Sequence, residues 1–349
     1  MESRKPYVDD IGSFPLPANI HRDDFNRAYR EARNMMAHGY STSAFTDNDF
    51  VKKNFYEVTL NSFRKKLQAG LDVVNYPQQF SGMDQVGDSI SKAMDHGTYT
   101  VDENEAFLPE VELIKREGKR LYEEFGKIIL LRISLFGPME HYIHRLGKLF
   151  YKKEAESFAE TIRLFAKKTI VNSKYVKTVV VSIDEPSFGF TDIDTTSDDI
   201  CDILEKAFDF EDVIKQIHLH SSSRLHDLLK VKNLDVLSFE YGASPKNIEG
   251  VSKKVLDQAD KNIRIGISRT DIDTFMADGW KQNRTPTSYE FMNFVETEET
   301  IRKRYVLAKE KFGDRMTFTG PDCGLGGWPN QDSAALLLKR TVKAVKTAQ

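Results

Sequence analysis

The sequence predicts an α/β protein, specifically a single (β/α)8 barrel of the TIM type with elaborated N-terminal segments. Two observations lead to this fold class. Eight short apolar runs alternate with amphipathic segments of helical period, and strands covered on both faces by such helices form parallel sheets. The chain also has 349 residues, 40% of them hydrophobic, which is enough for a closed barrel with additions.

The predicted strands are rich in Val, Ile and Leu, as strands buried on both faces should be. They span residues 8–14, 71–76, 128–136, 178–183, 213–220, 234–241, 263–267 and 316–320. The segments between them repeat apolar residues at helical spacing. These predicted helices span residues 51–69, 151–173, 198–208, 222–230, 245–260, 288–312 and 332–347.

Two stretches in the first third of the chain fit this repeat poorly. Residues 16–49 are polar and aromatic without strong periodicity, and residues 83–101 form a long excursion after the second strand. We expect both to wrap the barrel or to cover its mouth. Because no tandem repeat, low-complexity tract or Pro/Gly/Ser linker divides the chain, we expect one domain over residues 1–349.

The composition narrows the classes of partner. The 53 acidic residues nearly cancel the 50 Lys and Arg residues, so the charge does not indicate nucleic acid or an anionic membrane as a partner. No apolar run approaches the length of a membrane span, and the residues after Met1 are polar, unlike a leader. The two cysteines exclude a disulfide framework. We therefore expect a cytoplasmic protein with reduced thiols that binds a small molecule.

Four potential metal ligands stand at the downstream ends of three predicted strands. His218 and His220 end the fifth strand, Glu240 ends the sixth, and Cys323 follows the eighth. The C-terminal ends of barrel strands meet at one rim, where the active sites of these barrels form. Imidazole, carboxylate and thiolate together suit zinc. The sequence therefore predicts a four-coordinate zinc site made by these residues.

Each of these residues also has a purely structural interpretation when it is taken alone. Histidines at i and i+2 face the same side of a strand, but one of them could be a hydrogen-bonded core residue. Glu240 could form a salt bridge, since an unpaired buried carboxylate is costly. Cys323 could be a small buried residue, and Cys201 lies in a predicted helix, where a core or surface position is expected. The joint placement at one rim favours metal binding.

A series of motifs resembles the catalytic domain of cobalamin-independent methionine synthase, from about residue 8 to the C-terminus. The motifs are Ile-Gly-Ser-Phe-Pro (11–15), Ala-Gly-Leu-Asp-Val (69–73), Gly-Pro (137–138), Ile-Asp-Glu-Pro (183–186), His-x-His (218–220), Glu240 and Pro-Asp-Cys-Gly-Leu (321–325). The resemblance implies a barrel whose zinc binds homocysteine as a thiolate for S-methylation.

The resemblance covers the catalytic domain alone. Members of the family that use a polyglutamylated folate carry a second, N-terminal barrel, for which 349 residues leave no room. The chain is similar to the short, single-barrel "core" synthases, for which methylcobalamin or another methylcorrinoid is the expected methyl donor. The implied cofactor is zinc, the implied substrate is homocysteine, and a corrinoid protein is a possible partner.

The resemblance also implies roles for individual residues. His218, Glu240 and Cys323 map onto zinc ligands of the family. Asp184 and Ser13 map onto positions that hold the amino and carboxylate ends of homocysteine. The residue types agree, because a carboxylate can pair with an ammonium group and a serine hydroxyl can donate to a carboxylate.

The substrate site predicted in this way has five members. It comprises Gly12, Ser13, Gln78, Asp184 and Glu240. Gly12 enters because, with Ser13, it can offer a backbone N–H donor to the substrate carboxylate.

Three positions depart from the family pattern. His220 stands where the family usually has cysteine, which removes one negative charge from the site and should make the metal a stronger Lewis acid. Gln78 stands where a glutamate helps to hold the substrate ammonium, and an amide supplies no countercharge. Residues 266–269 lack the family's histidine after strand seven, the expected proton donor. His141 or His144 could fill that role, or they could simply begin a solvent-facing helix.

These departures keep two other interpretations open. Zinc-dependent alkyl transfer to another thiol, as in epoxyalkane:coenzyme M transferases, would need a cation for an anionic sulfonate, and Arg269 would suit that. A corrinoid- or metal-binding accessory protein would bind metal without alkylating a thiol.

Overall fold

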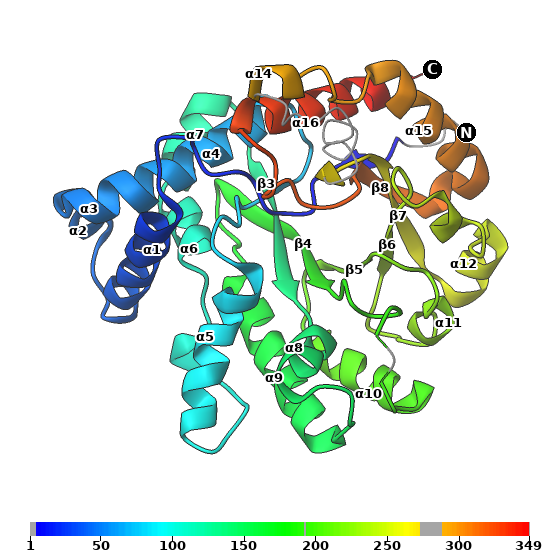
Figure 1. The fold of residues 1–349 in the computed structure, drawn as a ribbon, viewed down its shortest axis with the longest axis horizontal. Coiled ribbons are helices and arrows are strands. Elements are labelled where there is room, and N and C mark those ends of the chain that lie inside the picture. Colours follow the sequence, from blue (N-terminus) through cyan, green and yellow to red (C-terminus); the bar gives the residue numbers. More distant parts are fainter. Residues whose placement is uncertain (1–4, 192, 273–287, 349) are drawn as a thin grey trace, which may run out of the picture.

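The strands form a single parallel sheet that curls into a barrel (Figure 1). The structure is a computed structural model that describes residues 5–191, 193–272 and 288–348. Its strands are β1 (Tyr7–Val8), β2 (Val74–Asn75), β3 (Ile129–Phe136), β4 (Val176–Asp184), β5 (Ile214–Leu219), β6 (Val236–Glu240), β7 (Asn262–Ser268) and β8 (Met316–Pro321).

The strand order β1-β8-β7-β6-β5-β4-β3-β2 follows the chain around the sheet, and every neighbouring pair is parallel. A parallel bridge between Asp9 and Val73 links the chain just after β1 to the chain just before β2, so the two ends of the sheet meet. The predicted TIM-barrel class is confirmed.

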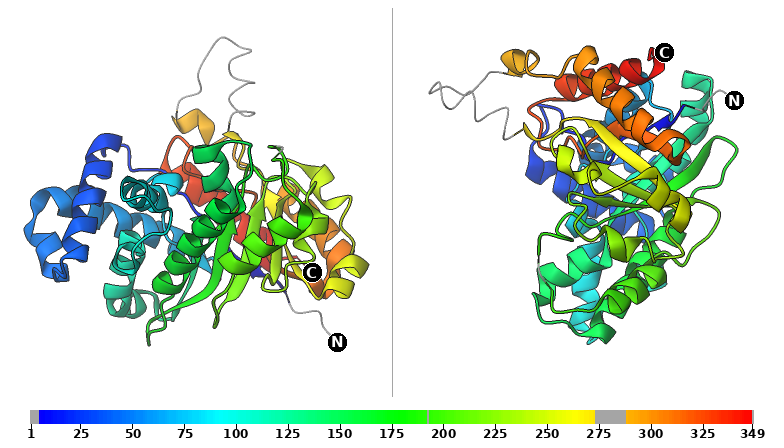
Figure 2. Two further views of the ribbon diagram at one scale, coloured as in Figure 1. Left: turned by 90° about the horizontal axis from the view of Figure 1, so that it is seen from below. Right: turned by 90° about the vertical axis from the view of Figure 1, so that its right-hand side faces the viewer.

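Helices surround the sheet, and those of the first third project to one side (Figures 1 and 2). The α-helices are α1 (Arg22–Ala37), α2 (Thr42–Asp47), α3 (Asp49–Val51), α4 (Glu57–Gln68), α5 (Gly82–Asp95), α6 (Pro109–Arg116), α7 (Gly118–Phe125), α8 (Pro138–Leu146), α9 (Lys152–Thr169), α10 (Ser197–Ala207), α11 (Leu225–Leu228), α12 (Lys253–Ala259), α14 (Ser288–Phe291), α15 (Glu298–Phe312) and α16 (Gln331–Lys346). A π-helical segment spans Lys52–Tyr56, and 3-10 turns span Glu103–Glu105, Pro245–Ile248 and Gly313–Arg315. Among the described residues, no helix combines the length and apolar character that a membrane crossing requires.

The first two strands are shorter than predicted, because the chain leaves the sheet to build the site. After β1, the Asp10 carboxylate accepts from Asn75 N (2.9 Å) and pairs with the buried Lys66 ammonium (2.6 Å). Phe14 N donates to Pro77 O (2.8 Å). Side-chain and loop contacts replace the strand ladder here.

Residues 16–49 are more helical than their sequence pattern suggests. Helix α1 begins after His21 and buries a stripe that includes Phe25 and Tyr29, which charged neighbours conceal in the sequence. Tyr29 stacks on Phe80 at 4.1 Å between ring centroids, so the extension has an aromatic core of its own beside the barrel.

Two predicted helices are broken by residues that cap a new helix. Residues 245–260 divide into a 3-10 turn and α12, whose N-terminus Ser252 caps through a hydrogen bond from Val255 N. Residues 288–312 divide into α14 and α15, which Thr297 caps by accepting from Thr300 N. Helix capping by Ser and Thr competes with continued helix.

The barrel interior contains an ion-paired layer that the sequence analysis did not predict. The Arg132 and Arg264 guanidiniums pair with the two oxygens of Asp9 at 2.8 and 2.7 Å, and all three side chains are fully buried. Because two cations face one carboxylate, this layer carries a net positive charge inside the barrel.

Candidate metal centre

The four predicted ligands come together at the C-terminal rim of the barrel. His218 is in β5, His220 follows it, Glu240 ends β6, and Cys323 follows β8. One ligand atom from each lies within 4.8 Å of the others. The parallel register explains this convergence, because β5 and β6 are neighbours and β8 curls around to the same rim.

The distances within this group are those of donors facing a common point. Cys323 Sγ lies 3.4 Å from His220 Nε2, which lies 3.5 Å from Glu240 Oε1. The fourth member, His218, has its Nδ1 3.2 Å from Ser238 Oγ. Its Nε2 is buried, and no residue that the structure describes forms a hydrogen bond with it. A buried ring nitrogen whose other nitrogen is held by a hydrogen bond is the usual arrangement of a metal-binding histidine.

Burial sets the charge state of these donors. Desolvation lowers the pKa of His218 well below its usual range and also lowers the pKa of His220. Desolvation, aided by the Asp322 and Asp271 charges, raises the pKa of Glu240 to about 8. Desolvation, aided by Glu240, raises the pKa of Cys323 to about 12. The imidazoles are therefore neutral, as ligation requires, and the two acids lack the countercharge that a divalent cation would supply. The residues fit zinc.

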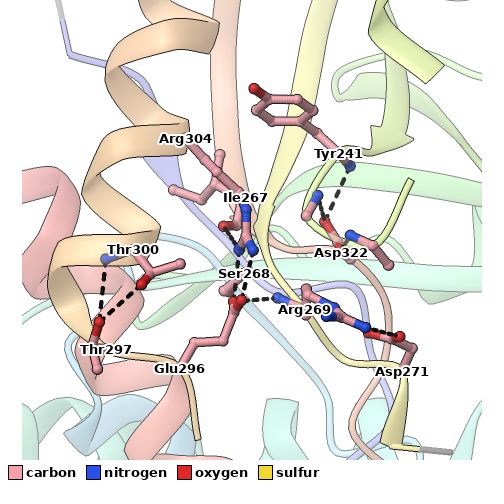
Figure 3. A network of polar contacts seen from close by, with 12 residues as sticks. Tyr241, Ile267, Ser268, Arg269, Asp271, Glu296, Thr297, Thr300, Arg304 and Asp322 are labelled. Carbon is pink, nitrogen blue, oxygen red and sulfur yellow. Dashed lines mark hydrogen bonds and ion pairs between the residues drawn. The ribbon is translucent and has the colours of Figure 1, made fainter. Parts of the chain in front are cut away.

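A buried carboxylate connects the loops that carry two of the proposed ligands (Figure 3). Asp322, next to Cys323, accepts from the backbone N of Tyr241 (3.2 Å), Gly242 (2.9 Å) and Ala243 (2.6 Å), just after Glu240. A Cβ on Gly242 would lie 2.7 Å from Asp322 Oδ2, so glycine permits this approach. Asp322 was not predicted from the sequence, although a carboxylate beside a proposed ligand in a glycine-rich segment is a signal for such a role.

Ser238 was also missed. It is fully buried in β6, two residues before Glu240, and so faces the same side of the strand. A hydroxyl in an otherwise apolar strand, in phase with a proposed ligand, is the signal that could have identified it. The parallel register pairs Asp184 with His218 and His218 with Ser238, so the three stand side by side on β4, β5 and β6.

A cavity of about 430 Å³ opens beside this group, within the usual size range of small-molecule sites. Its lining includes three of the proposed metal ligands and three of the predicted substrate-binding residues. These are His218, His220, Cys323, Ser13, Gln78 and Asp184. Gly12 and Glu240 are not part of the lining.

Ser13 and Gly12 also have structural contacts. Ser13 O accepts from Leu325 N (2.7 Å) and Ser13 Oγ accepts from Gly326 N (3.1 Å), which fixes the loop after Cys323. Gly12 O accepts from Lys66 Nζ (2.8 Å), and a Cβ on Gly12 would overlap Gln78 Oε1.

Asp184 presents a buried carboxylate to the cavity. Ser182 Oγ donates to its Oδ1 (2.6 Å). Burial raises the pKa of Asp184 to about 6, against the lowering effect of Arg132 and Arg264. The next residue has a different role, since Glu185 accepts from Met139 N and caps the start of α8.

The two histidines considered as proton donors are not in the cavity lining. His141 is fully buried in α8, with Nδ1 3.2 Å from Arg145 Nη1, and burial lowers the pKa of His141 to about 3. His144 is exposed on the same helix. The proton-donor role of His141 stays a prediction.

Arg269, considered as a partner for a sulfonate, is engaged elsewhere (Figure 3). Its Nη2 pairs with Asp271 Oδ2 at 2.5 Å and its backbone N donates to Glu296 (2.8 Å). Arg304 forms two further bonds to Glu296, at 2.8 and 2.7 Å. Arg269 is not among the residues that line the cavity.

Fold and site together define a (β/α)8 barrel with a candidate metal centre at the C-terminal rim. No family model and no curated protein matches the chain. Among solved structures, it is similar to a B12-independent methionine synthase from Shewanella sp. W3-18-1 in complex with selenomethionine (12% identity, TM-score 0.57, 98% of this chain and 97% of that one). It is also similar to a methyltransferase from Methanosarcina mazei (12% identity, TM-score 0.54, 97% and 94%). At this identity the likeness shows the fold.

Proposed function

We propose that this protein is a zinc-dependent methyltransferase that methylates the thiol of homocysteine to form methionine, with a methylcorrinoid as donor. The observation that carries the proposal is the group of four donors, from three strands, whose His218 Nε2 is buried without a partner beside a cavity. The two similar structures, a methionine synthase and a methyltransferase, support methyl transfer as the reaction class.

The charges of the four donors favour thiol chemistry. His218 and His220 are neutral, whereas Glu240 and Cys323 would contribute one negative charge each when they bind a cation. These two negative charges would balance the two positive charges of a divalent ion without leaving a net negative charge. When bound, zinc would supply a Lewis acid that lowers the pKa of a substrate thiol at this point.

The residues around the cavity would bind and orient the rest of the substrate. Asp184 is a buried carboxylate without a cation in direct contact, and it could pair with the substrate ammonium. In the proposed reaction the thiol sulfur forms a bond to the methyl carbon. The bond from that carbon to its donor breaks with its electron pair left on the donor, and the thiol proton passes to solvent.

The test combines metal analysis with a spectroscopic assay. Purified protein should contain about one zinc per chain, and the corrinoid spectrum should report demethylation of methylcobalamin when homocysteine is added. Coenzyme M in place of homocysteine tests the alternative thiol. Cys323→Ser and Glu240→Gln should lose zinc and activity. Full activity in a metal-free preparation would refute the proposal.

A further inference from the structure

One wall of the cavity presents a buried amide without a hydrogen-bond partner. The four proposed metal ligands lie at the ends of β5, β6 and β8. Gln78 follows β2, on the opposite side of the barrel from β6. Gln78 lines the cavity and is 7% exposed, and its Nε2 has no hydrogen-bond partner within the described part of the chain. A buried donor left unpaired is costly, and a ligand acceptor would satisfy it.

The backbone holds Gln78 in an uncommon conformation. Its φ is +46°, in the left-handed region that residues other than glycine seldom adopt. The neighbouring residues secure it, since Gln79 N donates to Glu110 Oε1 (3.0 Å) and Gln79 Nε2 donates to Pro15 O (2.9 Å). Strain that the surroundings maintain is a mark of functional positions.

The amide has a defined orientation within this loop. Its Oε1 faces Gly12, where the absence of a Cβ leaves room for it. Its Nε2 lies on the side of Gly82, which also lines the cavity. The buried group that is left without a partner is therefore the N–H donor.

A guanidinium stands on the same wall. Arg22, at the start of α1, lines the cavity, and its Nη1 donates to Gln79 O. Asn26, one turn further along α1, lines the cavity as well. Among the described residues of the lining, Asp184 at the end of β4 is the one carboxylate. The wall that follows β1 and β2 thus combines a positive charge with amide groups and carries no acid.

We propose that Gln78 and Arg22 form a subsite for the anionic end of the thiol substrate, which in homocysteine is the carboxylate. This inference rests on the proposed function, which assigns the sulfur to the four donors and the ammonium to Asp184. Amide and guanidinium N–H groups both donate, and charge-assisted bonds from a guanidinium to a carboxylate are strong and directional. The anionic end would meet two donor side chains, whereas the ammonium would meet the one carboxylate of Asp184, so the anionic end contributes more to substrate selection.

The test uses two analogues that each lack one group of homocysteine. 4-Mercaptobutyrate lacks the amino group, and 3-mercaptopropylamine lacks the carboxylate. Their binding to protein loaded with Co²⁺ is measured by calorimetry, while the rise of the thiolate charge-transfer absorption above the level that Cys323 gives reports coordination of the added sulfur. In the wild type, loss of the carboxylate should weaken binding at least about tenfold more than loss of the amino group.

Variants of the two subsite residues should reverse or remove the preference for the analogue that carries the carboxylate. Gln78→Glu, which is nearly isosteric, should favour 3-mercaptopropylamine because a carboxylate repels one anion and attracts an ammonium. Arg22→Gln should weaken 4-mercaptobutyrate about tenfold and leave 3-mercaptopropylamine unchanged. Arg30→Gln is the matched control, since Arg30 is on the same helix but pairs with Asp88 (3.2 Å) and does not line the cavity.

The possible outcomes distinguish failure of the subsite proposal from failure of the proposed function on which it rests. Equal binding of the two analogues to the wild type overturns the subsite, even if neither variant folds. A folded Gln78→Glu protein that still prefers 4-mercaptobutyrate overturns it as well. In both cases a thiolate band that grows when the thiol is added would leave the proposed function standing. If no thiol, homocysteine included, changes the Co²⁺ spectrum, both proposals fall.

Discussion

Replacing Ser238 by alanine should weaken zinc binding, although Ser238 is not one of the four proposed ligands, because Ser238 orients His218. The Ser238 hydroxyl lies 3.2 Å from His218 Nδ1, and both residues are buried. This hydrogen bond keeps the proton on Nδ1 and leaves the Nε2 lone pair free for a metal. Without it, the buried Nδ1–H loses its acceptor and the tautomer protonated on Nε2 becomes accessible.

The size of the effect follows from the kind of bond that is lost. One buried hydrogen bond to a neutral partner contributes about 0.5–1.5 kcal/mol, and the group left unpaired costs about 1–3 kcal/mol. Loss of a metal-orienting partner typically reduces metal affinity about 10- to 100-fold. We expect the zinc dissociation constant of Ser238→Ala to rise by this factor, as measured by competition with a chromophoric chelator.

Ser134→Ala is the matched control. Ser134 is also fully buried in the barrel, and its Oγ donates to Ile11 O (2.7 Å), but it contacts none of the four proposed ligands. Both variants should be less stable to denaturant by about 1–3 kcal/mol, and Ser238→Ala alone should lose zinc affinity. Equal zinc affinity in Ser238→Ala and the wild type would refute the assignment of His218 as an oriented ligand.

Two further predictions concern protons. Burial raises the pKa of Glu110 to about 7, so its protonated form stabilises the fold at low pH. That stabilisation is lost as the pH rises from the unfolded value near 4.5 towards 7, about 3 kcal/mol at 1.36 kcal/mol per unit. Denaturant unfolding of Glu110→Gln should lack this loss, and an unchanged pH dependence would contradict the assignment. Zinc binding at pH 7 should release about two protons, from Glu240 and Cys323, measured by calorimetry in buffers of different ionisation enthalpy; release of none would show that these acids do not bind the metal.

The sequence predicted the convergence of the four proposed metal ligands because that convergence depends on local pattern and one topological rule. Each of the four residues stands at the end of an apolar run, and parallel barrel strands bring such ends to one rim. The β5, β6 and β8 bounds agree closely with the predicted strands. The order of the motifs supplied the expectation of zinc-dependent thiol methylation, whereas the positions of the four residues followed from the strand pattern.

The missed features depend on contacts between distant parts of the chain. Arg132 and Arg264 are charged residues in strands, where a sequence pattern indicates solvent, yet they face the barrel interior and share Asp9. Asp322 acts on a loop 79 to 81 residues away in the sequence. Arg22 reaches the cavity from the first turn of α1, a helix that packs in the N-terminal extension and not in the barrel repeat. Local propensity and residue spacing do not predict such contacts between residues that are far apart in the sequence.

X-ray absorption at the zinc edge is the decisive measurement for the proposed zinc site, because it counts the sulfur neighbours of the metal. The resting protein should show one sulfur, from Cys323, at about 2.3 Å among nitrogen and oxygen neighbours, and homocysteine should raise the count to two. Cys323→Ser should show none at rest. A resting zinc without sulfur, or a sulfur count that homocysteine leaves unchanged, would contradict the account.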